Sequence, residues 1–382
     1  MKINWKLFGS YVLVAVLATV TTLATVHFLP IRQTKLEQLQ MLIEEKFVGE
    51  TDTTALEDAA AAAMLQSTGD RWSDYIPAGE YETYREQQEN AYVGVGITIQ
   101  ALEENGGFAI IQVNEKGPAA EAGIQVGDIL IGVEEQDVRS WTTEEVRNAV
   151  RGKEGTFISM KVLRKGEHST FSVERRKVLT EVATFEMLPN HVGLVTILNF
   201  DERCAEETIS AIETLLDNGA QKLIFDVRHN PGGYASEMVA VLDYLLPEGD
   251  LFRTVHYDGK EHVDTSDADC LEIPMAVLVN SSSYSAAEFF AAALRDYEAA
   301  VIVGEQTTGK GFYQNTFRLN DGSAVALSVG KYYTPGGVTL EGVGVTPDRK
   351  VELREEDASA LYYGTLLPEE DEQLQEAIKL LK

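Results

Sequence analysis

The pattern of apolar and polar positions divides the chain into four stretches of different texture. Residues 7–29 form an uninterrupted run without charge, and a run of this length can cross a bilayer as one helix. Residues 31–90 place apolar side chains at a helical period between charged ones. Residues 91–178 read as short strands broken by glycine turns, and residues 179–382 alternate strands with helices. The pattern therefore predicts an anchor, a helical region, a strand-rich domain and an α/β domain.

The first run predicts a transmembrane signal anchor. Lys2 and Lys6 precede it, so the positive-inside rule predicts a cytoplasmic tail at residues 1–6 and an extracytoplasmic remainder. The segment Thr22-Leu-Ala24 is an alternative, a candidate signal-peptidase site, but no polar region precedes it. We therefore favour a retained anchor, which implies a single-pass protein of the cell membrane with its catalytic part outside the cytoplasm.

The last stretch predicts an α/β core. Val192 to Ile197, Lys222 to Asp226 and Met275 to Val279 read as strands, and residues 205–217 read as a helix between the first two. This alternation favours a mainly parallel sheet, in which functional groups gather at strand ends. Residues 31–90 carry no candidate chemistry, and we interpret them as a packing element or a homodimerisation element.

Composition limits the classes of partner. The 382 residues, of which 44% are hydrophobic, are enough for two or three globular units. With 61 acidic and 32 basic residues the formal charge is −29, and such a chain lacks the basic surface that nucleic acid requires. Cys204 and Cys270 are best read as isolated thiols, with a bridge between them as the alternative.

The histidines give no sign of a metal site. The six lack the spacing of metal ligands, so neither a metal nor another cofactor is expected. Only His229, beside a glycine turn, lies near candidate chemistry.

A serine and a lysine in the last stretch are the strongest chemical candidates. Ser285 begins an apolar, alanine-rich helix, and Lys310 follows a strand in a loop with a glycine on each side. A neutral lysine amine can take the proton of a serine hydroxyl when burial lowers its pKa. The spacing thus predicts a serine–lysine dyad of a peptidase. The simpler alternative is that Ser285-x-x-Glu288 is only a capping box that starts the helix.

A glycine turn after the second strand is a candidate oxyanion site. Gly232 and Gly233 follow Asn230 and Pro231, and their amides, together with the N-terminus of the Ser285 helix, could stabilise a tetrahedral intermediate. An ordinary turn is the alternative.

The strand-rich stretch resembles a PDZ domain. The resemblance rests on a glycine loop before a strand, the turn Gly117-Pro-Ala-Ala-Glu-Ala-Gly123, the strand from Gly127 and a helix at residues 143–150. Such domains bind a carboxyl-terminal peptide as an added strand and hold its carboxylate on backbone amides. The loop expected to do so here consists of Val93, Gly94, Val95 and Gly96.

Nearly all of the chain after the anchor resembles the carboxyl-terminal processing proteases, also called tail-specific proteases. The motifs are Gly69-Asp-Arg-Trp-Ser, Phe225-Asp-Val-Arg-His-Asn-Pro-Gly-Gly, Ser285-Ala-Ala-Glu and Gly304-Glu-Gln-Thr-Thr-Gly-Lys-Gly-Phe-Tyr-Gln. The fold implied is an α/β peptidase core with an inserted PDZ domain. The roles implied are Ser285 as nucleophile, Lys310 as general base, Gln314 as the group that orients the lysine, Gly232, Ser285 and Ala286 as the oxyanion hole, and Asp296 as a structural residue.

The resemblance also implies how substrates reach the site. Protein or peptide substrates with nonpolar carboxyl termini would bind the PDZ domain, and this binding would align Lys310 with Gln314. Arg151 and Arg164 are candidate relays of that signal. Tyr284 and Ala287 depart from the small residue and the serine usual at these positions. The alternative function is an inactive, PDZ-containing adaptor that only binds protein tails.

Overall fold

A computed structural model describes residues 10, 14, 16–19, 33–103, 106–114 and 116–381. The chain forms two compact units, Met1–Thr68 and Gly69–Lys382. The anchor predicted at residues 7–29 lies largely outside the described residues. Within those residues, no helix has both the length and the apolar character needed to cross a membrane.

The first unit contains two described helices, α2 (Lys35–Lys46) and α3 (Thr53–Gln66). Thr34 and Glu37 form a capping box at the start of α2, and the Asp52 carboxylate accepts two amides at the start of α3. Neither helix buries a side chain. The helical interpretation of this segment is confirmed, whereas a homodimer through it stays a prediction.

The PDZ-like segment forms an antiparallel sheet in the order β3-β4-β5-β7-β8, with β6 beside β5. The separate pair β2–β9 leads the chain into and out of this sheet. The strands are β2 (Ala91–Gly94), β3 (Ile97–Ala101), β4 (Phe108–Val113), β5 (Ile129–Val133), β6 (Gln136–Asp137), β7 (Phe157–Arg164), β8 (Glu167–Glu174) and β9 (Arg176–Leu179), and the helices are α5 (Pro118–Ala122) and α6 (Thr143–Val150). Its own apolar cluster includes Phe108, Leu130, Val146 and Met160. Among the described residues, β3 is an edge strand of this sheet.

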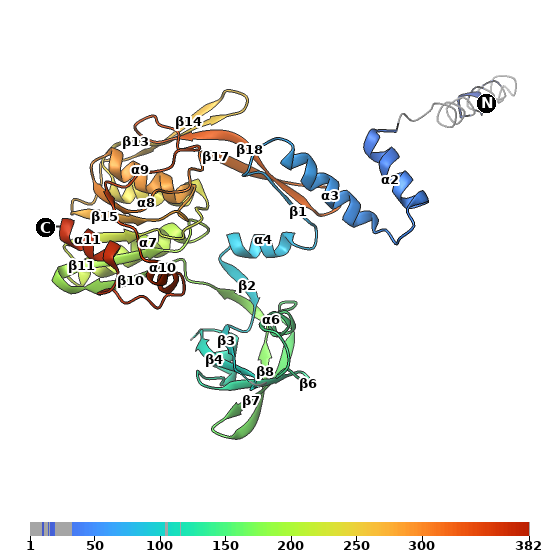
Figure 1. Ribbon diagram of the computed structural model, residues 1–382, viewed down its shortest axis with the longest axis horizontal. Helices are drawn as coiled ribbons and strands as arrows, with labels where there is room; N and C mark the ends of the chain where they lie inside the picture. The colour runs from blue at the N-terminus through green and yellow to red at the C-terminus, as the bar shows by residue number, and fades with distance from the viewer. Residues whose placement is uncertain are drawn as a thin grey trace, which may run out of the picture. The chain divides into compact units, whose positions relative to one another are not determined.

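The second sheet confirms the predicted α/β core (Figure 1). Its order is β10-β11-β12-β15-β16-β19, and only the pairing of β10 with β11 is antiparallel. The strands are β10 (Ala183–Leu188), β11 (Val192–Ile197), β12 (Lys222–Asp226), β15 (Met275–Val279), β16 (Ala300–Gly304) and β19 (Arg349–Lys350). A sheet of parallel strands needs cover on both faces, which is why β15 is wholly apolar and the middle of β12, Leu223 to Phe225, is apolar as well.

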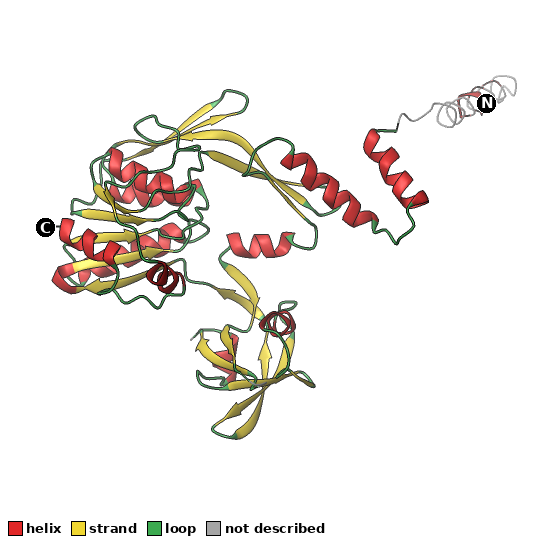
Figure 2. Ribbon diagram, in the orientation of Figure 1, coloured by secondary structure: helices red, strands yellow, loops and turns green. Residues whose placement is uncertain are grey.

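Helices cover both faces of this sheet (Figure 2). One apolar cluster joins the sheet to α7 (Cys204–Asp217), α8 (Ala235–Leu245) and α9 (Ala286–Asp296). A second cluster, on the opposite side chains of the same strands, includes Leu374 and Ala377 of α11 (Glu372–Leu380). The short helix α10 (Glu355–Tyr362) precedes α11. The α9 helix is therefore fixed at the sheet, with nine of its residues buried.

A third sheet was not predicted from the sequence. It has the order β1-β18-β13-β14, with β17 also on β18, and all its pairings are antiparallel. Its strands are β1 (Asp74–Ile76), β13 (Gly249–His256), β14 (Glu261–Ser266), β17 (Phe312–Arg318) and β18 (Ala324–Tyr333). Most positions of β14 and β17 are exposed or only half-buried, so these strands lack the alternation that identifies a strand in a sequence.

The two cysteines are free thiols. Cys204 is buried in the core, and burial raises the pKa of its thiol to about 12. The interpretation as isolated thiols is confirmed, and the alternative of a bridge is wrong.

A buried ion cluster connects the segment around Asp371 and Gln373 to the six-stranded sheet. The Arg228 guanidinium, just after β12, lies 2.7 Å from the Asp371 carboxylate at the start of α11 and also pairs with Asp226. It donates a further hydrogen bond of 3.0 Å to Gln373 Oε1. All four side chains are buried.

We expect Arg228→Ala to lower the free energy of unfolding by about 3–5 kcal/mol, because two carboxylates would be left buried without a cation. Urea denaturation of the purified protein measures this. Arg139→Ala is the control, since the Arg139–Asp137 pair is more than half exposed and should matter little. Equal effects of the two substitutions would contradict the assignment.

Candidate active site

Ser285 stands at the N-cap of α9 in an unusual backbone conformation. Its φ is 58° and its ψ is −126°, and a positive φ is strained for a residue with a Cβ atom. The Ser285 amide donates to Glu288 Oε2 at 3.0 Å, and the side chain is 7% exposed. Ser285 thus starts helix α9, as the sequence predicts, and this N-cap position also determines where its hydroxyl lies.

The Glu288 carboxylate joins this helix to the lysine loop. Oε2 also accepts the Lys310 amide at 2.8 Å, while Oε1 accepts the Gly309 amide at 2.8 Å and the Thr307 hydroxyl. Glu288 is fully buried, and burial raises its pKa while the hydrogen bonds lower it. Sequence analysis identified Glu288 only as a cap. Its contact with the loop depends on the tertiary fold.

Lys310 is half-buried and lines the same cleft as Ser285. Burial lowers the pKa of its amine, whereas the carboxylates of Asp70, Glu288 and Glu341 act in the opposite direction. A lowered pKa increases the fraction of neutral amine at neutral pH, which is what a general base requires. Among the residues that the structure describes, Lys310 Nζ forms no hydrogen bond with Ser285 Oγ or with Gln314.

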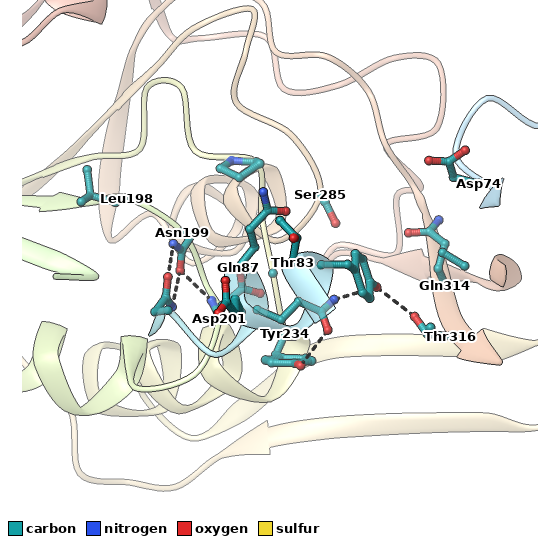
Figure 3. Close-up of a pocket in the computed structure, with 18 of the residues that line it drawn as sticks. Asp74, Thr83, Gln87, Leu198, Asn199, Asp201, Tyr234, Ser285, Gln314 and Thr316 are labelled. Carbon is teal, nitrogen blue, oxygen red and sulfur yellow. Dashed lines mark hydrogen bonds between the residues drawn. The ribbon is translucent and has the colours of Figure 1, made fainter. Parts of the chain in front are cut away.

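Gln314 lies on β17 and contacts the neighbouring strand. Its Nε2 donates to Ser328 Oγ of β18 at 3.1 Å and to the Phe312 carbonyl at 3.3 Å. In this conformation Gln314 therefore does not orient the lysine. Figure 3 shows Gln314 and Ser285 on the same cleft.

The glycine turn packs directly against Ser285. A Cβ atom on Gly232 would lie 2.7 Å from Ser285 Cβ and 2.9 Å from the Ala286 nitrogen, so only glycine fits. The structure thus brings Gly232, Ser285 and Ala286 together, as expected. The Gly232 amide donates to Asn230 Oδ1 at 2.8 Å in its own loop. The Ala286 amide, the first of the helix, has no partner within α9.

A cleft of about 1320 Å³ contains the candidate residues (Figure 3). The peptidase core contributes Ser285, Lys310, Gln314, Gly232 and Gly233. Helix α4 (Tyr81–Gln88) and the PDZ-like segment contribute further residues, among them Tyr84, Gln87, Gln88, Arg147 and Arg151. The volume is sufficient for several residues of an extended peptide.

A chain of hydrogen bonds crosses this cleft. The Tyr234 hydroxyl donates to Gln88 Oε1 at 3.1 Å, and Gln88 Nε2 donates to the Tyr84 hydroxyl at 2.8 Å. The Tyr84 hydroxyl then bonds with Thr316 Oγ1 at 2.9 Å (Figure 3). Helix α4 thereby connects the start of α8 with β17, the strand of Gln314. No local sequence signal marks these residues.

Asp201 is another cleft residue that sequence analysis missed. It follows Phe200, whose backbone would lie 2.3 Å from a Cβ atom on Gly233. Burial, with the negative charges of Glu202 and Glu237 as smaller causes, raises the pKa of Asp201 to about 7. Its carboxyl group can therefore be protonated at neutral pH, beside the glycine turn.

The rival serines have other positions. Ser283 is fully buried, and its hydroxyl donates to the Val227 carbonyl at 2.7 Å. Ser281 and Ser282 are exposed and do not line the cleft. Asp296 accepts the Gly336 amide at 2.9 Å, which fits the structural role expected for it.

The PDZ-like loop and the two candidate relay arginines form the following contacts. The Val93 amide donates to Glu86 Oε1 of α4 at 3.1 Å, and Arg151 pairs with Glu86 Oε2 at 3.2 Å. Arg151 thus connects the PDZ-like segment with the helix that crosses the cleft. Arg164 instead forms an ion pair of 2.6 Å with Asp128 inside the PDZ-like segment.

His229 connects the glycine turn with the serine loop. Its amide donates to Asn280 Oδ1, and its Nε2 lies 3.0 Å from Asn280 Nδ2. Asn280 Oδ1 also accepts the Ser282 amide at 3.1 Å. The Asn280 amide group can donate only to a neutral imidazole, and burial lowers the pKa of His229 accordingly. No group of metal-binding side chains occurs among the described residues.

The lowered pKa of His229 predicts a pH dependence of stability. Between its folded pKa and about 6.5 the unfolded chain binds more protons, so stability falls as the pH drops through this window. His229→Asn should remove that part of the dependence in unfolding curves measured from pH 8 to pH 5. His168→Asn, on an exposed part of β8, should retain it. Identical slopes for all three proteins would show that His229 does not titrate in this way.

Comparison with known proteins points to one family. Residues 191–351 match the profile of peptidase family S41, and residues 86–163 match that of the PDZ domain. The carboxy-terminal processing protease CtpA of Bacillus subtilis is 31% identical over 322 residues, which cover 84% of this chain and 69% of that protein. A probable CtpA-like serine protease of Staphylococcus saprophyticus is 28% identical over 83% of this chain, and the chain spans 65% of the length of that relative.

A solved structure supports the same comparison. The photosystem II D1 C-terminal processing protease is 25% identical, with a TM-score of 0.50 over 88% of this chain and 91% of that one. An S41 protease structure from Bacteroides fragilis, 18% identical with a TM-score of 0.53 over 84% of this chain, shares the fold.

Proposed function

The chain belongs to the peptidase S41 family of carboxy-terminal processing proteases, and on this premise we propose that it is a serine endopeptidase that acts through Ser285 and Lys310. Ser285 Oγ attacks the scissile carbonyl while the neutral Lys310 amine takes its proton. The resulting ammonium returns the proton to the leaving amine. Water then hydrolyses the acyl-enzyme with Lys310 again as the base.

One observation carries this proposal: a single buried carboxylate holds the backbones of the nucleophile and of the base in one cleft. Glu288 Oε2 accepts the amides of both Ser285 and Lys310, at 3.0 and 2.8 Å. A capping box that only starts a helix has no need of the second contact. The arrangement therefore favours the catalytic interpretation of Ser285-x-x-Glu288 over the simple cap.

The described conformation requires two changes before it is productive. Gln314 must leave Ser328 to reach Lys310, and the Gly232 amide must leave Asn230 to join Ala286 at the oxyanion. Apo geometry of this kind is common, because catalytic hydrogen bonds often form only with substrate. In this proposal Arg151 transmits ligand binding to α4 through Glu86, whereas Arg164 stabilises the PDZ domain from within.

Ser285→Ala and Lys310→Ala should each abolish cleavage of an unfolded protein with a nonpolar carboxyl terminus, a loss of at least about 10³-fold in kcat/KM. Cleavage is followed by mass spectrometry of the products. Ser282→Ala, which changes an exposed serine outside the cleft, is the matched control. Full cleavage by either Ser285→Ala or Lys310→Ala would refute the assignment of that residue to the catalytic dyad. Tight peptide binding without any cleavage by the unsubstituted protein would instead favour an adaptor.

The substrate class follows from the PDZ domain. β3 is an edge strand beside α6, and a peptide can add to such an edge as a further strand. The amides of the loop at residues 93–96 would hold the terminal carboxylate, although the Val93 amide now donates to Glu86. Protein tails with a nonpolar last residue are therefore the proposed ligands.

Binding of such tails should depend on the free carboxylate. We expect a labelled peptide with a nonpolar end to bind the full chain carrying Ser285→Ala about tenfold or more tightly than its carboxy-amidated form, since a charged hydrogen bond is worth about 1.5–3 kcal/mol. Fluorescence anisotropy measures both affinities. A peptide of the same composition ending in aspartate is the control. Equal affinity for the acid and the amide would remove the proposed role of the loop.

The proposed function also includes the location of the protein in the cell. The uncharged run at residues 7–29 behind Lys2 and Lys6 supports a membrane anchor with the protease outside the cytoplasm. Such a placement would present the active site to extracytoplasmic proteins.

A further inference from the structure

Two aromatic side chains enclose the amine of Lys310. Its Nζ lies 5.3 Å from the centre of the Trp72 ring and 5.8 Å from the centre of the Tyr284 ring. The two rings stack on each other, with their centres 6.4 Å apart and an angle of 20° between their planes. Both rings also line the cleft of Ser285. The Lys310 amine thus lies next to a pair of stacked aromatic rings in the cleft that Ser285 lines.

The Trp72 ring is held in this place by several contacts. Its Nε1 donates to both carboxylate oxygens of Glu341 at 3.1 Å, and the same carboxylate accepts the Gly311 amide at 2.8 Å. The neighbouring Arg71 donates to the Gly309 carbonyl at 3.1 Å. The ring is therefore held, through Glu341 and Arg71, to the residues on both sides of Lys310.

We propose that Trp72 and Tyr284 are positioning residues that exclude water from the Lys310 amine and so allow it to act as a base. This inference rests on the proposed function of the Ser285–Lys310 site and assigns the residues that make it work. Tyr284 immediately precedes the nucleophile. At this position the bulky ring of Tyr284 excludes water from the Lys310 amine, which a small residue could not do.

Two opposing effects of the rings must be compared. An aromatic face attracts an ammonium ion and would raise the pKa of the lysine by about one unit. Removal of water disfavours the ammonium ion and can lower the pKa by up to about 3–5 units when burial is complete. The Arg71 guanidinium already lies 4.1 Å from the centre of the Trp72 ring, which weakens the first effect further. At the half-buried Lys310, burial is the largest cause acting on the pKa of the amine and lowers it, so exclusion of water is the larger effect.

The charged groups around the amine come from three segments. Asp70 and Arg71 precede β1, Glu288 belongs to α9, and Glu341 lies between β18 and β19. The three carboxylates favour the ammonium ion, and burial opposes them with the larger effect. If the rings are removed, water enters and the carboxylates remain. The pKa of Lys310 should then rise.

The test is the pH profile of kcat/KM for a peptide substrate. Trp72→Ala and Tyr284→Ser should move the acid limb of the profile to higher pH by about one unit, with an approximately tenfold loss at neutral pH that is recovered in alkali. Trp72→Phe and Tyr284→Phe keep a ring and should leave the limb near its original pH. Tyr257→Ala, at a side chain that is 80% exposed, is the control for the loss of an aromatic residue.

Other outcomes would overturn the proposal. A uniform loss at every pH, without movement of the limb, would mean that the rings only stabilise the fold. A movement to lower pH would mean that their attraction for the ammonium ion is the larger effect. Thermal unfolding of each variant identifies any that do not fold, and the two positions provide independent variants.

A second measurement does not depend on proteolysis. Competitive acetylation of the lysines with acetic anhydride, followed by mass spectrometry across a range of pH, reports the pKa of Lys310 directly. It should be higher in Tyr284→Ser than in Tyr284→Phe, and equal values would refute the proposal. If the substrate is not cleaved by the unsubstituted protein, the proposed function fails while this comparison still decides the role of the rings.

Discussion

The candidate site depends on the hydrogen bonds that the Glu288 carboxylate accepts. This side chain is buried and forms no salt bridge with any residue that the structure describes, and its oxygens accept amides from α9 and from the lysine loop. A buried carboxylate is tolerated only where its hydrogen bonds are satisfied. The loop is therefore held against the helix, because separating the two would leave the buried carboxyl group without these hydrogen bonds. Ser285 and Lys310 line the same cleft for that reason.

The remaining parts of the site are arranged around that carboxylate. The glycine turn reaches Ser285 because Gly232 and Gly233 have no Cβ atoms to prevent it. Trp72 and Glu341 hold the lysine loop from its other side. Gln314 and Thr316, where the hydrogen-bonded chain through α4 ends, belong to β17 of the antiparallel sheet and line the cleft. In the proposed mechanism the frame of Ser285 and Lys310 stays fixed, whereas Gln314 and the Gly232 amide have to move.

This division has a physical basis. The core sheet is covered on both faces by two apolar clusters, so its strand ends cannot shift without opening a packed interior. The strand that carries Gln314 is mostly exposed or half-buried, and local rearrangement of such a segment costs less. The mechanism proposed above needs both properties. The frame of Ser285 and Lys310 has the first, and the contact between Gln314 and Ser328 has the second.

The sequence by itself determined the parallel core and the PDZ-like segment and indicated Ser285 and Lys310 as candidate residues, because apolar strands, glycine turns and a helix start signal act over short distances. It also indicated Gln314, through a motif. Only the tertiary structure decided that Glu288 bonds to the lysine loop, that Trp72 lies over an amine more than two hundred positions later, and that Tyr84 and Gln88 cross the cleft. Contacts of this kind depend on the packing of distant segments, and no local pattern of residues encodes them.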